Sequence, residues 1–345
     1  MRLDLVLVGF GNVARRFVRL AQEMAGPLGC DHDLTLRVCG IVTARRGATF
    51  DEAGVDAVAA ADALDAGGTL GEPGPARDVI ARSAALGTTR VLVETTPLNV
   101  HTGQPAIDHI RAALNAGLHV VTANKGPVAI AWGELDRLAR ERGVLFLFEG
   151  AVMDGIPIFN LVRETMPGVR ITGFRGVVNS TTNHILTMME DGGEFGPALE
   201  EMQRAGIAEA DAALDVDGWD AAAKTAALAN VLMHAALTPA DVDRIGIRDI
   251  TGANVRNAVA QGRRIRLVAS FRDGRARAGP EELPAGDPLA QLRGMQNAII
   301  FGTDLLGNVA VTQLAGGLTQ TAYALVSDLV TVARRIRSDG GAPAR

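Results

Sequence analysis

One junction near the start of the chain limits the folds that are open to it. Residues 5–8 form a continuous apolar run, and residues 13–24 carry apolar side chains at steps of three and four. The run is typical of a parallel strand buried on both faces, and the spacing is typical of an amphipathic helix. Between them, Gly9-Phe10-Gly11-Asn12-Val13-Ala14 fits the pattern G-x-G-x-x-A, which lets a pyrophosphate approach bare backbone at a helix N-terminus. A dinucleotide site is predicted; a tight turn without a ligand is the alternative.

The alternation of strand-like and helix-like segments continues through the first part of the chain. Further strands are expected at residues 34–42, 91–93, 119–122 and 144–148. After Gly150 the pattern changes to expected strands at 171–178, 265–271 and 298–301, an Ala-rich helix at 220–237, and a Gly- and Pro-rich loop at 274–288. We therefore expect an α/β fold: a Rossmann-like doubly wound parallel sheet over residues 1–148, rejoined by about 316–345, and an α+β domain over 149–315.

Composition and charge exclude several classes of protein. Hydrophobic residues make up 48% of the 345 residues, which is too many for a disordered chain. A net charge of −5 gives no general basic surface for nucleic acid, and two cysteines are too few for a disulfide framework. No apolar run approaches the roughly 20 residues of a membrane span, and the N-terminus shows no signal peptide. We expect a cytoplasmic protein that binds a small molecule and neither nucleic acid nor membrane.

The end of the second expected strand bears on the choice of cofactor. NAD sites usually carry an acid there for the ribose 2′-hydroxyl, but this chain has Thr43-Ala44-Arg45-Arg46-Gly47. Guanidinium groups suit the 2′-phosphate of NADP, so NADP(H) is the preferred cofactor, with NAD(H) also possible. The alternative is that Arg45 and Arg46 belong to a solvated turn.

Two later segments follow strands at the edge where an open parallel sheet binds ligands. Glu94-Thr95-Thr96-Pro97 follows one strand, and residues 122–126, which include Lys125, follow the next. A lysine at this edge can reach the cofactor or a substrate oxyanion. The alternative is a surface lysine in a turn.

An acidic block precedes the long Ala-rich helix. Five carboxylates lie within residues 209–220, and Lys224 stands four residues after Asp220, on the same helix face. An ordinary ion pair at this spacing contributes only about 0.2–0.5 kcal/mol. The alanines around Lys224 favour close packing, however, and a partly buried lysine beside carboxylates is a tunable proton donor.

Three segments together carry a family resemblance. Residues 176–186 (GVVNSTTNHIL), 206–211 (GIAEAD) and 215–224 resemble the signature region of homoserine dehydrogenases. The similarity extends through residues 122–125 and 149–157 to Gly316-Gly317, so that it covers nearly the whole chain. The chain is similar to the short monofunctional form of the family.

The resemblance implies an NAD(P)-dependent enzyme that interconverts L-aspartate 4-semialdehyde and L-homoserine in threonine and methionine biosynthesis. It also implies a homodimer formed through the second domain. Lys224 would be the proton donor, Asp220 its substrate-binding partner, and Lys125 the lysine where cofactor and substrate meet. The implied substrate contacts are Asn179, Thr181, Glu209, Asp215 and Asp220. The cofactor contacts expected from the loops and the resemblance are Gly9, Phe10, Gly11, Asn12, Val13, Arg45, Arg46, Thr95, Thr96, Lys125, Gly206 and Gly317.

The resemblance further implies a structural sodium ion. Its ligands would be Glu149 and the backbone carbonyls of Val152, Asp154 and Ile156. One carboxylate with several carbonyls is a donor set that suits a hard cation.

The chain departs from the family pattern at several positions. Ser180 stands where the family usually has Gly and His184 where it usually has Tyr, and residues 153–155 and 313–317 differ from the usual glycine-rich segments. A related dehydrogenase for another amino-acid-derived aldehyde is therefore one alternative. A non-catalytic NADP-binding sensor is another, although the intact Lys125 and Lys224 argue against it.

Overall fold

The computed structural model describes residues 1–204 and 212–339. The chain divides into two compact units: the first comprises Met1–Pro157 and Gly317–Arg345, and the second comprises Ile158–Gly316. Among the described residues, no helix is both long and apolar enough to cross a membrane.

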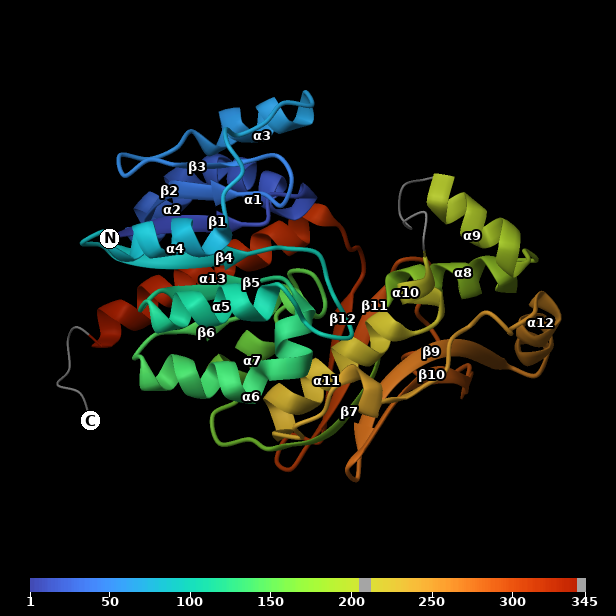
Figure 1. The fold of residues 1–345 in the computed structure, drawn as a ribbon. Coiled ribbons are helices and arrows are strands. Elements are labelled where there is room, and N and C mark those ends of the chain that lie inside the picture. The colour runs from blue at the N-terminus through green and yellow to red at the C-terminus, as the bar shows by residue number, and fades with distance from the viewer. Residues whose placement is uncertain (205–211, 340–345) are drawn as a thin grey trace. The chain divides into compact units, whose positions relative to one another are not determined.

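A six-stranded sheet in the order β3-β2-β1-β4-β5-β6 forms the centre of the first unit (Figure 1). Its strands are β1 (Arg2–Val8), β2 (Thr35–Val42), β3 (Ala48–Phe50), β4 (Thr89–Glu94), β5 (His119–Thr122) and β6 (Phe146–Leu147). All of them are parallel except β3, which pairs antiparallel with β2 at the edge. This order changes direction at β1, as the predicted doubly wound sheet requires.

Helices enclose this sheet because its strands are apolar toward both faces. Leu5 of β1 belongs to one apolar cluster with Phe17 of α1 (Asn12–Glu23) and Leu325 of α13 (Leu318–Asp339). Every residue of β1 after Arg2 is buried, as predicted for a strand covered on both sides. The other helices of this unit are α2 (Ala25–His32), α3 (Ala57–Asp65), α4 (Ala76–Ala84), α5 (Ala106–Asn115), α6 (Lys125–Glu141) and the short 3₁₀-helix η1 (Glu149–Ala151).

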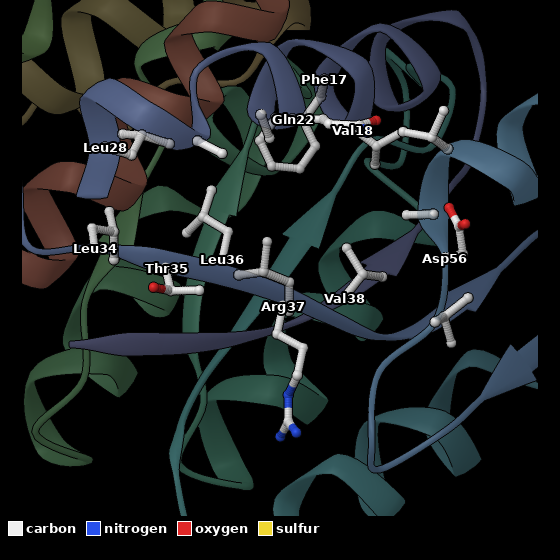
Figure 2. Close-up of a pocket in the computed structure, with 16 residues that line it drawn as sticks. Phe17, Val18, Gln22, Leu28, Leu34, Thr35, Leu36, Arg37, Val38 and Asp56 are labelled. Atoms are coloured by element: carbon white, nitrogen blue, oxygen red, sulfur yellow. The ribbon is translucent and has the colours of Figure 1, made fainter. Parts of the chain in front are cut away.

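A cavity of about 380 Å³ opens beside β2, among α1, α2 and residues 55–58. Figure 2 shows Leu36 pointing toward α1, whereas the guanidinium of Arg37 points away from the cavity, toward its partner Asp4. Most of the lining side chains are apolar, and none of them follows the carboxyl end of a strand. This cavity is therefore separate from the edge of the sheet where the dinucleotide was predicted.

The second unit contains another six-stranded sheet, in the order β12-β11-β7-β9-β10-β8. Its strands are β7 (Ile171–Val177), β8 (Asp243–Arg244), β9 (Arg263–Arg272), β10 (Arg275–Pro284), β11 (Asn297–Thr303) and β12 (Asn308–Gln313). Its helices are α7 (Phe159–Thr165), α8 (Ser180–Glu190), α9 (Phe195–Arg204), α10 (Ala213–Val216), α11 (Trp219–Met233), η2 (Pro239–Asp241) and α12 (Gly252–Ala260). All strand pairs of this sheet are antiparallel except that of β8 with β10, as expected for an α+β unit.

The loop predicted over residues 274–288 is wrong for most of its length. Residues 275–284 form β10, which pairs antiparallel with β9 from Arg275 opposite Arg272 to Pro284 opposite Arg263. The turn is Asp273-Gly274, and both residues have positive φ, as a type I′ hairpin turn requires. The Gly and Pro content suggested a loop, but Ala276 and Ala278 alternate inward as a half-buried strand does.

Candidate functional site

The glycine loop lies between β1 and α1, where the sequence predicted it. Gly9 has φ +85°, its N–H donates to the Val42 carbonyl at 3.0 Å, and an added Cβ would lie 2.6 Å from the backbone of Thr95 and Thr96. Gly11 precedes the first residue of α1, and an added Cβ there would meet nothing within 4 Å. Gly9 is thus required by the fold, whereas Gly11 leaves open space at a helix N-terminus, as a pyrophosphate needs.

A cavity of about 500 Å³ adjoins this loop at the carboxyl ends of β1, β2 and β4. Its lining includes Gly9, Thr43, Thr96 and His109. Thr95 joins two of the loops, because its hydroxyl donates to the Gly9 carbonyl at 2.8 Å. The arrangement is that of a ligand site at the point where the strand order reverses.

The two arginines after β2 differ in their surroundings. Arg46 donates from Nη1 to the Leu64 carbonyl at 2.8 Å, at the end of α3, and its N–H donates to the Thr43 hydroxyl at 2.8 Å. Arg45 is exposed and has no hydrogen bond or ion pair within the part of the chain that the structure describes. Arg45 is therefore the guanidinium available to a phosphate, whereas Arg46 fastens the turn to α3.

The remaining cofactor candidates of the first unit lie at the same edge of the sheet or at the start of α13. Lys125 is the first residue of α6, which Asn124 caps by accepting the Gly126 N–H at 3.0 Å. Phe10 is buried, and the Asn12 side chain accepts a hydrogen bond from Arg15 at 2.7 Å. Val13 lies in the first turn of α1, and Gly317 directly precedes α13.

In the second unit, the fold brings four of the predicted residues together. Asp220 in the first turn of α11 and Lys224 one turn later form an ion pair of 3.0 Å, with 11% and 15% of their side chains exposed. Asn179 donates from Nδ2 to Asp215 Oδ1 at 2.7 Å and to Asp220 Oδ2 at 2.8 Å. The acid–lysine pair is thus part of a half-buried cluster rather than a solvated helix face.

Local sequence explains how Asn179 reaches both acids. It is the N-cap of α8, where its Oδ1 accepts the Thr182 N–H at 2.8 Å, so that its Nδ2 is left to donate to the acids. Thr181, in the first turn of the same helix, is also buried. The bridging role of Asn179 was not foreseen from the sequence, although its capping position could have indicated it.

The Val178 carbonyl is a further group that the sequence did not reveal. It accepts a hydrogen bond from Lys224 Nζ at 2.6 Å. An ammonium group has three donors, and the partners of Lys224 among the described residues, Val178 and Asp220, use two of them. One N–H therefore remains for a substrate oxygen.

One described member of the acidic block lies outside the cluster. Asp217 forms an ion pair with Arg248 instead. Gly206 and Glu209, which were predicted to contact cofactor and substrate, lie outside the described residues.

The segment predicted to bind sodium surrounds η1 in the first unit. Glu149 is buried, and its N–H donates at 2.8 Å to Asp328 of α13, a buried acid that the sequence did not single out. Asp154 has φ +51° and accepts the Thr321 hydroxyl at 3.0 Å, while Val152 and Ile156 lie on either side of it. No group of three or more His, Cys, Asp or Glu side chains suited to a metal occurs within residues 1–204 and 212–339. A cation here would rely mainly on carbonyls, which suits sodium better than zinc.

Family comparisons cover both units. Residues 9–149 match the family described as homoserine dehydrogenase, NAD binding domain, and residues 157–330 match the family described as homoserine dehydrogenase. The NAD(+)-dependent homoserine dehydrogenase of Pseudomonas canavaninivorans is 36% identical over 335 residues, which are 95% of each chain. The homoserine dehydrogenase of Methanocaldococcus jannaschii is 36% identical over 337 residues, or 96% of this chain and 98% of that one.

Solved structures show the same architecture. A putative homoserine dehydrogenase from Archaeoglobus fulgidus has a TM-score of 0.87 at 29% identity, and the match covers 96% of this chain and 99% of that one. A hyperthermophilic archaeal homoserine dehydrogenase in complex with NADPH has a TM-score of 0.82 at 28% identity, covering 97% and 98%.

Proposed function

Because this chain belongs to the homoserine dehydrogenase family of NAD(P)-dependent oxidoreductases, we propose that it interconverts L-aspartate 4-semialdehyde and L-homoserine, with NADP(H) preferred. The observation that carries the proposal is the cluster of Asn179, Asp215, Asp220 and Lys224. The cluster offers a proton donor, and its two carboxylates outnumber its one ammonium group. The excess negative charge suits the ammonium group of an amino-acid substrate.

The chemistry divides between the cofactor and the side chains. When bound, the nicotinamide would supply or accept the hydride. Lys224 would direct its remaining N–H at the substrate oxygen and release a proton to it as negative charge develops there. Asp220 holds Lys224 in place, since the two groups form an ion pair of 3.0 Å.

Substrate orientation would fall to the other members of the cluster. Asp215 would bind the substrate amine, with Glu209 as a further acid by resemblance. Asn179 keeps Asp215 and Asp220 at a fixed separation, and Thr181 lies buried in the first turn of α8. Lys125 would add positive charge near the substrate oxygen and stabilise it electrostatically.

The cofactor preference is supported by the end of β2. No acid stands there, and Arg45 is available for the 2′-phosphate. One relative is named as NAD(+)-dependent, and one solved relative is a complex with NADPH, so both cofactors occur within the family. Equal affinities of the unmodified protein for NADPH and NADH would contradict the proposed preference.

A structural sodium ion and a homodimer complete the proposal. Glu149 and the carbonyls of Val152, Asp154 and Ile156 would hold the ion. The resemblance implies a dimer formed through the second unit and a role in threonine and methionine biosynthesis. Sedimentation equilibrium would test the dimer directly.

The decisive experiment is NADPH oxidation measured with aspartate 4-semialdehyde and, in parallel, with a panel of other small aldehydes. His184 carries a buried Nδ1 that has no hydrogen-bond partner in the described part of the chain, at a position where the family usually has Tyr. This observation favours the second candidate, a dehydrogenase for another amino-acid-derived aldehyde. Faster turnover of a different aldehyde would select that candidate.

A further inference from the structure

The carboxyl group of Glu94 is the most buried acid beside the predicted cofactor site, and the reaction as described above makes no use of it. Glu94 ends β4 and is 0% exposed. Its Oε1 accepts the Thr96 N–H at 2.8 Å and also the Thr96 hydroxyl, and its Oε2 lies 2.9 Å from the Thr122 hydroxyl. The Glu94 carboxyl group and these partners, here called the Glu94 network, join the ends of β4 and β5.

The Glu94 network extends from β4 to the start of α6. The Thr122 hydroxyl accepts the Asn124 N–H at 3.0 Å, and Asn124 Nδ2 donates to the Thr96 carbonyl at 3.0 Å. Asn124 is also the cap of α6, whose first residue is Lys125. The network therefore joins Glu94 to the backbone that carries Lys125.

Thr95 connects the Glu94 network to the glycine loop. Thr95, between Glu94 and Thr96, donates its N–H to the Val8 carbonyl at 2.9 Å and its hydroxyl to the Gly9 carbonyl at 2.8 Å. The backbone of Thr96 also forms the wall that only glycine can approach at position 9. The Glu94 carboxyl group thus joins the segments after β4 and β5, and the adjacent Thr95 joins the segment after β4 to the glycine loop.

The hydrogen bonds of the Thr122 hydroxyl indicate the protonation state of the Glu94 carboxyl group. The Thr122 hydroxyl lies 2.9 Å from both the Glu94 backbone carbonyl and Glu94 Oε2, but it has one proton to donate. A proton on Oε2 resolves this: Oε2 then donates to Thr122, and Thr122 donates to the carbonyl. With the Asn124 N–H, the hydroxyl donates once and accepts twice, which is its full capacity.

We propose that Glu94 is a positioning residue for the reaction: as a neutral carboxylic acid, it holds the loop after β4 against the start of α6 and so places Lys125. The inference rests on the proposed function, because it gives Lys125 a role in that site. Ionisation would remove one donor from the network and leave two oxygens of Glu94 competing for one Thr122 proton.

The surroundings of Glu94 support a neutral group near neutral pH. Burial raises its pKa to about 7, and hydrogen bonds involving Thr96, Thr122 and Asn124 offset only part of that rise. Uncharged groups face it from the β4 loop, β5 and the cap of α6, and β1 contributes the backbone of apolar Val8 beside the loop. Lys125 is the first charged side chain of α6. The hydrogen bonds of the Glu94 network should therefore weaken as the pH rises through about 7.

The test compares Glu94→Gln with the unmodified protein. A glutamine amide can donate to Thr122 while its oxygen accepts from Thr96, so it copies the neutral acid and cannot ionise. Glu52→Gln, at an exposed position outside the network, is the matched control, and it also reports the titration of the cofactor's own phosphate. NADPH affinity is measured by fluorescence titration between about pH 6 and pH 8, the range in which a group of pKa near 7 changes its charge.

We expect affinity to fall by up to about tenfold over the unit above pH 7 in the unmodified protein and in Glu52→Gln, and to stay level in Glu94→Gln apart from the cofactor's own titration. The melting temperature of the cofactor-free protein gives a second readout. A carboxyl whose folded pKa is raised stabilises most below its unfolded value of about 4.5, and this stability is lost toward pH 7, so the unmodified protein should lose stability there relative to Glu94→Gln.

An error in the positioning role and an error in the proposed function would give different results. If the unmodified protein and Glu94→Gln respond identically to pH in both measurements, the positioning role is wrong and the proposed function stands. If the unmodified protein binds neither NADPH nor NADH, the proposed function and this inference are both wrong.

Discussion

The two units of the molecule carry candidate site residues of different kinds. In the first unit, the site consists mainly of backbone: the turn at Gly9, the open space beside Gly11 and the N-terminus of α1. In the second unit, it consists of buried side chains that bind one another, with Asn179 between two acids and Lys224 against one of them. A backbone site selects by shape and space, whereas a side-chain cluster holds charges in place before the substrate arrives.

The largest expected effect is a loss of turnover when Lys224 is replaced. Lys224→Met keeps most of the side-chain volume and the helix propensity but removes the proton donor. Turnover should fall by roughly 10²–10⁴, the usual contribution of general acid–base catalysis, while NADPH affinity changes little because the glycine loop belongs to the other unit. Steady-state kinetics and NADPH titration on the same preparation measure both.

Two outcomes would contradict the role of Lys224 as the proton donor. Retention of most activity in Lys224→Met would leave Lys224 as an ordinary ion-paired helix residue. Absence of turnover with any aldehyde in the unmodified protein, together with unchanged NADPH binding in the variant, would indicate the sensor. Asp220→Ala should lower turnover in the same direction, because it removes the partner that holds Lys224.

The glycine loop offers a matched pair of backbone tests. Gly9→Ala places a Cβ 2.6 Å from the Thr95 backbone at φ +85°, and such strain costs on the order of 1–3 kcal/mol. Gly11→Ala meets nothing within 4 Å at φ −80°, so the free energy of unfolding should fall by less than 1 kcal/mol or so, the cost of a poorer N-cap. Both should weaken NADPH binding, the second by occupying the space of the pyrophosphate. Urea unfolding and NADPH titration separate the two effects, and equal destabilisation by both substitutions would contradict this account.

The arginine side chains after β2 should contribute to the preference for NADPH over NADH rather than to the affinity for both cofactors. Replacing Arg45 and Arg46 by Ala should narrow the gap between NADPH and NADH by roughly 1–3 kcal/mol, the range for hydrogen bonds to charged groups. Most of this should come from Arg45→Ala, since Arg46 already donates to the Leu64 carbonyl. Arg46→Ala is the control, and a larger selectivity change in Arg46→Ala than in Arg45→Ala would reverse the assignment.

Much of the candidate site in the first unit could be predicted from sequence because its determinants are local. The glycines, the buried run of β1 and the helix after it adjoin one another in the chain, so a short pattern contains the whole turn. The proton-sharing network of Glu94 could not be predicted in this way, because it depends on β4 and β5 pairing with Glu94 opposite Thr122. The apolar cavity beside β2 likewise depends on how α2 packs.

In the second unit, the sequence predicted the residue types and one local ion pair but not the longer-range contacts. Asp220 and Lys224 share a helix, and their ion pair follows from a spacing of four residues. The bridge from Asn179 to Asp215 spans 36 residues, and the contact between Lys224 and the Val178 carbonyl spans 46. The same acidic pattern suited Asp217 equally well, yet Arg248 pairs with it, which no local spacing could indicate.

The smallest expected effect concerns the sodium segment, which combines both kinds of material: a buried carboxyl at Glu149 and a turn of carbonyls after it. A ligand that binds only the folded state adds RT ln(1 + [L]/Kd), which is about 1 kcal/mol at five times Kd, or roughly 2–4 °C for a unit of this size. Exchanging choline for sodium at constant ionic strength should raise the melting temperature of the unmodified protein by this amount. Glu149→Gln keeps the shape and the backbone N–H that donates to Asp328, so it should lose the sodium response without a large change in choline. Asp191→Asn, an exposed acid in the second unit, should keep the response. A melting temperature that does not respond to sodium in the unmodified protein would mean that the turn after Glu149 is a structural connection only.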